Sequence, residues 1–174
     1  MNSSEGPQEE IVLRGNRFDV HRLNLVGSDG QTYQREVIRH PGAVVLLPIL
    51  DDGRLVMIQN TRATVGETLL ELPAGTREPD EPVETTADRE LIEETGYRAG
   101  ALKLIHTFYS APGISDEVMY LFLATELSEG ESAREATEQI ENQIATREEV
   151  REWLAADKIK DAKTLVGLYA FLAM

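Results

Sequence analysis

Residues 75–97 are the stretch that most constrains how this chain folds, because they hold the signals for the start, body and end of one helix. Pro82 suits a first helical turn, where its missing N–H is not needed, and the acidic residues just before it suit the positive end of a helix. Gly96 is the residue type expected at a left-handed C-terminal cap. The pattern predicts a helix between Pro82 and Gly96, preceded by a loop that begins at Gly75.

Three glutamates lie on one side of this helix. At about 100° per residue, Glu90, Glu93 and Glu94 fall within an arc of roughly 100°. They repel one another unless a cation lies among them, and their hard oxygens suit Mg²⁺ or Mn²⁺. Arg89 can pair with Glu93 and steady the group. Taken alone, the cluster allows a second interpretation, a solvated acidic face on an acidic protein.

The spacing around the helix decides between these interpretations. It runs as a Gly, five residues, a Glu, seven residues, and then Arg-Glu-apolar-any-Glu-Glu-any-Gly-apolar. This order resembles the signature of the Nudix hydrolase family, and a chance match is remote because most of the fixed positions demand a single residue type. The matching residues are Gly75, Glu81, Arg89, Glu90, Leu91, Glu93, Glu94, Gly96 and Tyr97.

The resemblance implies that a diphosphate linked to another group is hydrolysed by an activated water, with Mg²⁺ or Mn²⁺ and more than one ion per site. It makes Glu90 and Glu94 metal ligands, together with the backbone carbonyl of Ala74. Glu93 is then a catalytic residue that acts through a second ion or through water. Glu81 is expected to brace the loop, although an exposed acid at the helix start would look the same in the sequence. We expect Glu94 to belong to a solvent-facing cluster and not to the core.

Two features outside the signature resemble the ADP-ribose pyrophosphatase branch of this family. Pro112 lies sixteen residues beyond Gly96 and is followed by a glycine and an acidic residue, although an ordinary Pro-Gly turn is the alternative. Residues 1–40 form an extension ahead of the hydrolase part, and the branch uses such an extension to build a homodimer whose sites draw on both subunits. The chain lacks an early Trp to stack the base, so Phe18 or Tyr33 is expected to serve, which leaves the preferred base open.

The resemblance also implies site residues outside the helix. Arg62 matches an arginine that contacts the substrate's phosphates. Arg35 is expected to reach the diphosphate from the N-terminal strands. Either could instead be an exposed surface charge. Glu138 matches an acidic loop residue that binds metal or takes the proton of the attacking water, with Glu135 as a rival because loop lengths vary here.

Composition limits the remaining classes of function. The chain has 174 residues, of which 41% are hydrophobic and 28% charged, and no run approaches the ~20 apolar residues of a membrane span. A net charge of −14 gives it no electrostatic reason to bind nucleic acid. The absence of Cys excludes disulfides and thiolate metal sites. The N-terminus lacks the basic start and apolar centre of a signal peptide, so we expect a cytoplasmic protein without a membrane or nucleic-acid partner.

Alternating and apolar runs predict the strands. Residues 11–39 are typical of a small antiparallel sheet with a hairpin turn at 28–30. Residues 43–50 predict a buried strand, and residues 54–60 are expected to return beside it as its partner. Further strands are expected at 69–72, 102–109, 118–124 and 140–144, and a mobile loop is expected at 128–139.

Two helices are expected near the C-terminus. Thr146 and Glu149 form a capping box at the start of the first, and Asp161 can cap the second. The second helix is expected to place Leu165, Leu168, Tyr169 and Leu172 in the core. The expected fold class is α+β, a Nudix fold with a mixed β-sheet between helices in an α/β/α arrangement. Residues 1–40 are expected to be a dimerising N-terminal antiparallel extension, and residues 41–174 the hydrolase domain.

Three kinds of function follow. The first is Mg²⁺-dependent hydrolysis of ADP-ribose, or a related nucleoside diphosphate sugar, to AMP and ribose 5-phosphate. The second is the same chemistry on GDP-mannose or another nucleotide sugar. The third is a regulatory module that binds ADP-ribose without hydrolysing it. The presence of all three signature glutamates, Glu90, Glu93 and Glu94, favours an enzyme.

Overall fold

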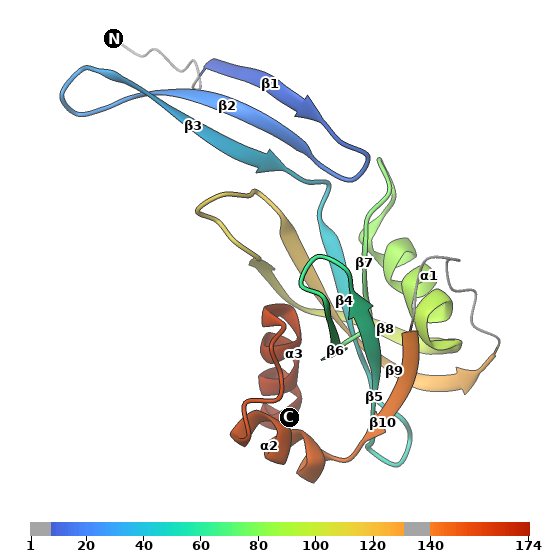
Figure 1. The fold of residues 1–174 in the computed structure, drawn as a ribbon. Coiled ribbons are helices and arrows are strands. Elements are labelled where there is room, and N and C mark those ends of the chain that lie inside the picture. The colour runs from blue at the N-terminus through green and yellow to red at the C-terminus, as the bar shows by residue number, and fades with distance from the viewer. Residues whose placement is uncertain (1–7, 131–139) are drawn as a thin grey trace.

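The computed structural model describes residues 8–130 and 140–174 and builds them from strands and three helices (Figure 1). The strands are β1 (Gln8–Arg14), β2 (Asp19–Val26), β3 (Thr32–Arg39), β4 (Ala43–Pro48), β5 (Leu55–Arg62), β6 (Glu67–Glu71), β7 (Ala74–Thr76), β8 (Tyr97–Tyr109), β9 (Val118–Glu129) and β10 (Ile140–Ala145). The helices are α1 (Val83–Thr95), α2 (Arg147–Ala155) and α3 (Ala162–Ala173). None of the helices in these described ranges is long and apolar enough to cross a membrane.

The N-terminal strands form a separate antiparallel sheet in the order β1-β2-β3, which stands apart from the rest of the chain in Figure 1. The predicted hairpin turn is present between β2 and β3, where Gly30 adopts a left-handed conformation with φ of 77°. β3 ends at Arg39, close to the proposed division at residue 40. The sheet is joined to the turn that contains Pro112 through a hydrogen bond from the Ile38 N–H to the Ile114 carbonyl, of 2.8 Å.

The central strand β4 lies between helices on both sides. Its residues are all buried, and successive side chains point to opposite faces, as in any strand. Val45 packs in one core cluster with Leu168 of α3, whereas Val44 packs in the other with Leu91 of α1. Figure 1 shows α1 on one side of β4 and α3 on the other. The expected α/β/α arrangement is therefore confirmed.

The partner predicted for β4 was wrong. β4 pairs with β7 and with β9 in a mixed sheet of order β7-β4-β9-β8, whereas β5 belongs to a second sheet of order β10-β5-β6. A single bridge between Ile49 and Leu55 links the two runs. The turn at residues 51–53 therefore carries the chain from one sheet to the next. The runs within residues 43–50 and 54–60 are apolar without alternation. Such sequences predict buried strands but do not predict which strands pair with them.

The C-terminal helices begin where the sequence predicts. Thr146 and Glu149 form a complete capping box on α2, and the Asp161 side chain accepts a hydrogen bond from the Thr164 N–H at the start of α3. Leu168 is fully buried as expected, but Tyr169 is 61% exposed, so its assignment to the core was wrong. α3 is apolar nearly all round, which hides from the sequence which stripe faces the sheet.

The predicted loop at residues 128–139 is only partly testable. Ser128 and Glu129 continue strand β9, so the loop does not start where expected. Residues 131–139 lie outside the described residues, and with them both Glu135 and Glu138.

Candidate active site

α1 ends at the residue that its sequence predicts but begins one residue later than expected. It follows Pro82, which is its N-cap and not a residue of its first turn, and it ends at Gly96, whose φ of 80° is left-handed and whose N–H donates to the Ile92 carbonyl. The loop ahead of the helix is held by Arg77, whose Nη2–H donates to the Glu81 carbonyl at 2.8 Å and whose Nη1–H donates to the Pro41 carbonyl at 3.1 Å. One bond closes the loop between β7 and α1 on itself, and the other ties it to the segment just before β4.

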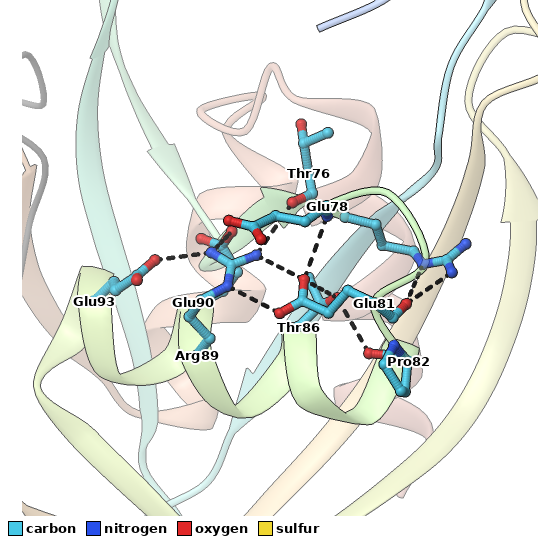
Figure 2. A network of polar contacts seen from close by, with 9 residues as sticks. Thr76, Glu78, Glu81, Pro82, Thr86, Arg89, Glu90 and Glu93 are labelled. Atoms are coloured by element: carbon cyan, nitrogen blue, oxygen red, sulfur yellow. Dashed lines mark hydrogen bonds and ion pairs between the residues drawn. The ribbon is translucent and has the colours of Figure 1, made fainter.

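Glu81 braces this loop, as predicted. Its carboxylate accepts hydrogen bonds from Arg89 Nη2–H at 3.0 Å, from the Thr86 hydroxyl at 2.8 Å and from the Glu78 N–H at 3.3 Å (Figure 2). The Arg89 guanidinium is the main reason that the pKa of Glu81 falls from 4.5 to about 2. The same bond to Glu81, aided by Glu90 and Glu93, raises the pKa of Arg89. Glu81 is therefore charged at any physiological pH.

Arg89 is the cation that lies among the signature glutamates. Its Nη1–H group donates to Glu90 at 2.7 Å and to Glu93 at 2.9 Å, so the predicted Arg89–Glu93 pair is confirmed. Figure 2 shows the guanidinium at the centre of this network, between Glu81 on one side and Glu93 on the other. Within the described ranges no three acidic or His side chains already converge on one point as metal ligands. Arg89 offsets the mutual repulsion of these glutamates.

Two of the glutamates are buried. Glu90 is 9% exposed and Glu94 is 3% exposed, so the expectation that Glu94 belongs to a solvent-facing cluster was wrong. The Glu94 carboxylate accepts a hydrogen bond of 2.8 Å from the Ala74 N–H, which ties the helix to β7. A Cβ atom at Gly75 would lie about 1.9–2.1 Å from the Glu90 carboxylate, so only glycine leaves room for this side chain.

This donor set fits a hard divalent cation. Glu90 and Glu94 are one helical turn apart, and the Ala74 peptide lies against Glu94 through its N–H. Arg89 retains Glu81 and the Thr76 carbonyl as partners, so it can release Glu90 and stay hydrogen-bonded. Carboxylate and carbonyl oxygens are the ligands that Mg²⁺ and Mn²⁺ prefer. The predicted ligands Ala74, Glu90 and Glu94 are thus brought together.

The glutamates lie in the wall of a cavity of about 910 Å³, which is within the range of small-molecule sites. Its walls come from seven parts of the chain: the turn between β1 and β2, the segment from the end of β3 to the start of β4, the end of β5, the signature loop with α1, the end of β8, the start of β9, and the start of α3. Arg62, Glu90, Glu93 and Glu94 all line it. The cavity thus joins the predicted metal ligands to a predicted phosphate-binding residue.

The structure distinguishes the other predicted site residues. Phe18 lines the cavity, whereas Tyr33 lies on β3, where its hydroxyl donates to Asp29 at 2.6 Å and it lines no part of the cavity. Phe18 is thus the better placed of the two to stack a base. Arg35 lies on β3, opposite Leu23 of β2 in the strand register, and it is exposed. It does not line the cavity, so one chain alone does not bring it there.

Sequence reasoning missed Glu71 and Lys163. Glu71 is 1% exposed and accepts two hydrogen bonds from Arg62, at 2.9 and 2.7 Å, which are the main cause of the raised pKa of Arg62. Lys163 lines the cavity and donates to the same Glu71 carboxylate. No periodicity or motif marks Glu71, because its partners lie 9 and 92 residues away in the chain.

Comparison with known proteins gives one family. The model of the NUDIX domain matches residues 39–171. The ADP-ribose pyrophosphatase of Bacillus subtilis (strain 168) is 38% identical over 162 residues, which are 92% of this chain and 88% of that protein. The GDP-mannose pyrophosphatase of Cronobacter sakazakii (strain ATCC BAA-894) is 33% identical over 171 residues, 91% of this chain and 86% of that protein. A crystal structure of ADP compounds hydrolase superposes with a TM-score of 0.80 at 25% identity, covering 97% of this chain and 94% of that one.

Proposed function

The chain belongs to the Nudix family of hydrolases, and on that premise we propose that it is a Mg²⁺-dependent pyrophosphatase of nucleoside diphosphate sugars, with ADP-ribose as substrate and AMP and ribose 5-phosphate as products. The observation that carries the proposal is the placement of Glu90, Glu93 and Glu94 in the wall of one cavity with Arg62. An acidic protein can hold a nucleotide sugar only where cations offset its charge, and this cavity supplies such a place.

Glu90, Glu94 and the Ala74 carbonyl would hold the ions. When bound, divalent ions neutralise the diphosphate and lower the pKa of water. The proposal includes more than one ion, Mg²⁺ with Mn²⁺ as a substitute, because one diphosphate and one water both need to be held.

The remaining residues bind the substrate and take a proton. Glu93 accepts the proton of the attacking water, either directly or through an intervening water, and Glu138 shares this task from the segment outside the described residues. Water oxygen forms a bond to one phosphorus while the bridging oxygen leaves with the other phosphate. Arg62 binds the diphosphate, and Phe18 stacks on the base.

The proposal includes a homodimer. β1 is exposed along its whole length, with Ile11 at 40% and Leu13 at 54%, so the N-terminal sheet offers apolar surface to a second copy. Arg35 then reaches the diphosphate of the partner's site. A cytoplasmic location is part of the same proposal, on the strength of the acidic, cysteine-free composition.

GDP-mannose is the second candidate substrate, favoured by the similarity to GDP-mannose pyrophosphatase. Both candidates are tested by incubating the protein with a panel of nucleoside diphosphate sugars and Mg²⁺, and measuring kcat/KM from the phosphate that alkaline phosphatase releases from the products. We expect ADP-ribose to give the highest kcat/KM and Glu93→Gln to lower kcat at least 100-fold. Faster turnover of GDP-mannose would select the second candidate. Binding of ADP-ribose without turnover would instead indicate a regulatory module.

A further inference from the structure

Lys163 occupies an unusual position for a lysine. It lies in the first turn of α3 with a side chain that is only 10% exposed, and it lines the same cavity as the signature glutamates. Its Nζ–H groups donate to Glu71 at 2.6 Å and to Asp161 at 2.8 Å. Two of its three N–H groups are thus held by the protein, at the wall of the cavity.

Glu71 joins Lys163 to Arg62. One oxygen, Oε2, accepts both from Arg62 Nη2–H at 2.7 Å and from Lys163 Nζ–H at 2.6 Å. Since both nitrogens contact one atom, they lie no further apart than about 5.3 Å, the two lengths end to end. Glu71 itself is 1% exposed, so its carboxylate is out of reach of solvent. The cavity wall therefore carries two cations side by side.

Two neighbouring cations around a buried carboxylate are not expected to stabilise the fold by themselves. A cation in the first turn of a helix is disfavoured by the helix dipole. Burying an ion pair costs desolvation energy that the attraction between the charges often fails to offset, and apolar side chains of the same size often do as well. Two cations at this spacing also repel each other, and Glu71 and Asp161 only balance them. An anion in the cavity would favour the arrangement directly.

Both cations retain donors for such an anion. Arg62 uses Nε–H and Nη2–H for Glu71, and Lys163 has a third N–H group. Within residues 8–130 and 140–174, Arg62 Nη1 donates to no protein acceptor. A guanidinium fork and a point charge close together suit the neighbouring oxygens of a diphosphate.

We propose that Lys163 is a second diphosphate-binding residue beside Arg62, and that Glu71 is the positioning residue that holds the two cations together. The inference rests on the proposed function, since it names residues of the same site. The ligand chemistry is a diphosphate ester, whatever base or sugar it carries.

The first test compares Lys163→Met with Lys160→Met. Lys160 is a matched control because it lies three residues earlier, is 54% exposed in its side chain and pairs with Asp157 away from the cavity. Steady-state kinetics with ADP-ribose should show at least a tenfold rise in KM for Lys163→Met, with kcat within about threefold of wild type. Lys160→Met should match wild type in both. Lys163→Arg, which keeps the charge, should recover most of the KM.

A binding measurement separates this inference from the proposed function. Calorimetric titration of metal-free protein with α,β-methylene-ADP, whose diphosphate link resists hydrolysis, should show at least tenfold weaker affinity for Lys163→Met than for wild type. This readout does not need turnover. If wild type binds the analogue but hydrolyses no nucleotide sugar, the proposed function fails while the comparison of variants still tests Lys163.

Glu71→Gln tests the positioning role. This variant keeps the shape of the side chain but removes the charge that holds the cations, so KM should rise as for Lys163→Met. Glu71 is proposed to act through Lys163 and Arg62. Combining Glu71→Gln with Lys163→Met should therefore raise KM by much less than the product of the two single effects. Unchanged KM and affinity in folded Lys163→Met would overturn the proposal. Loss of the native thermal transition in both Lys163→Met and Lys163→Gln would assign Lys163 to folding and overturn it equally.

Discussion

Gly75 lies directly against the side chain of Glu90 on α1. Its missing side chain leaves the space in which the Glu90 carboxylate lies, since a Cβ atom there would be within about 2.1 Å of that carboxylate. Gly75 does not have a positive φ, so backbone strain is not the reason that a glycine is needed here. The residue is required for the position of another side chain.

We predict that Gly75→Ala lowers kcat/KM at least tenfold, because the added methyl group displaces the Glu90 carboxylate from the proposed metal site. Gly113→Ala is the matched control, since a Cβ atom there would meet nothing within 4 Å. Initial rates over a Mg²⁺ titration check this, and the loss should include a higher Mg²⁺ concentration for half-maximal rate. Equal rates for the two variants would contradict the role given to Gly75.

Glu94→Gln should abolish hydrolysis and leave the fold intact. Glu94 is 3% exposed and accepts the Ala74 N–H at 2.8 Å, and the amide oxygen of Gln can accept the same bond. We therefore expect Tm to change by no more than about 3 °C and kcat to fall at least 100-fold, as measured by thermal denaturation and steady-state kinetics. Near-normal turnover at saturating Mg²⁺ would remove Glu94 from the metal ligands.

At the scale of elements, the loop between β7 and α1 is held by charge. The pKa of Glu81 falls from 4.5 to about 2 because the folded state favours the charged form. This stabilisation is fully present above pH 4.5 and is lost as the pH falls from 4.5 toward 2. Below that window the protonated carboxyl no longer pairs with Arg89.

We predict that Glu81→Gln lowers Tm by roughly 2–6 °C at pH 7, and that the difference from wild type shrinks as the pH falls from 4.5 to 2. Calorimetric scans across this range measure the difference. Glu84→Gln, an exposed change in the first turn of α1, is the control and should stay close to wild type throughout. A Glu81→Gln difference that is constant with pH would contradict the stabilising role of the charge.

Local signals predicted the elements better than their partners. Gly96, Thr146 and Asp161 end or begin their helices as predicted, because a cap depends on residues a few positions apart. The pairing of β4 with β9 joins segments more than 70 residues apart, and an apolar run carries no information about such a neighbour.

The sequence likewise predicted some residues of the candidate site but not the long-range contacts that place them. Helical spacing alone places Glu90, Glu93 and Glu94 together, and the family resemblance adds Arg62, which does line the cavity. The burial of Glu94 follows from its contact with Ala74, and Lys163 enters the site only through the packing of α3. Such contacts join distant parts of the chain, so their geometry was not predictable from the pattern of residues.

At the scale of the whole molecule, the N-terminal sheet needs a cover for its exposed apolar residues. We predict a homodimer of twice 19.4 kDa by light scattering at micromolar concentration. Replacing Ile11 and Leu13 with Glu should give the monomer mass, because charge on β1 opposes burial. Val65→Glu, at a site 60% exposed between β5 and β6, should leave the dimer intact. A 19.4 kDa species from the unmodified chain would refute the dimer.

A mixing experiment tests whether the two subunits share a site. Arg35→Ala and Glu94→Gln chains are each expected to be inactive as homodimers. After exchange of subunits, a mixed dimer holds one site with both an intact Arg35 and an intact Glu94 if these come from different chains. Recovered turnover would show that the site is shared, and an inactive mixture would place both residues in the same chain.

The turn between β1 and β2 contributes Phe18 to the cavity, while the glutamates come from α1. This turn is closed by its own hydrogen bond, from the Gly15 N–H to the Phe18 carbonyl at 3.1 Å. Mutations that change the turn can therefore accumulate without disturbing the helix that carries the proposed hydrolytic groups. Over evolutionary time, lineages that share this architecture can diverge in the base they accept while inheriting the same hydrolytic chemistry.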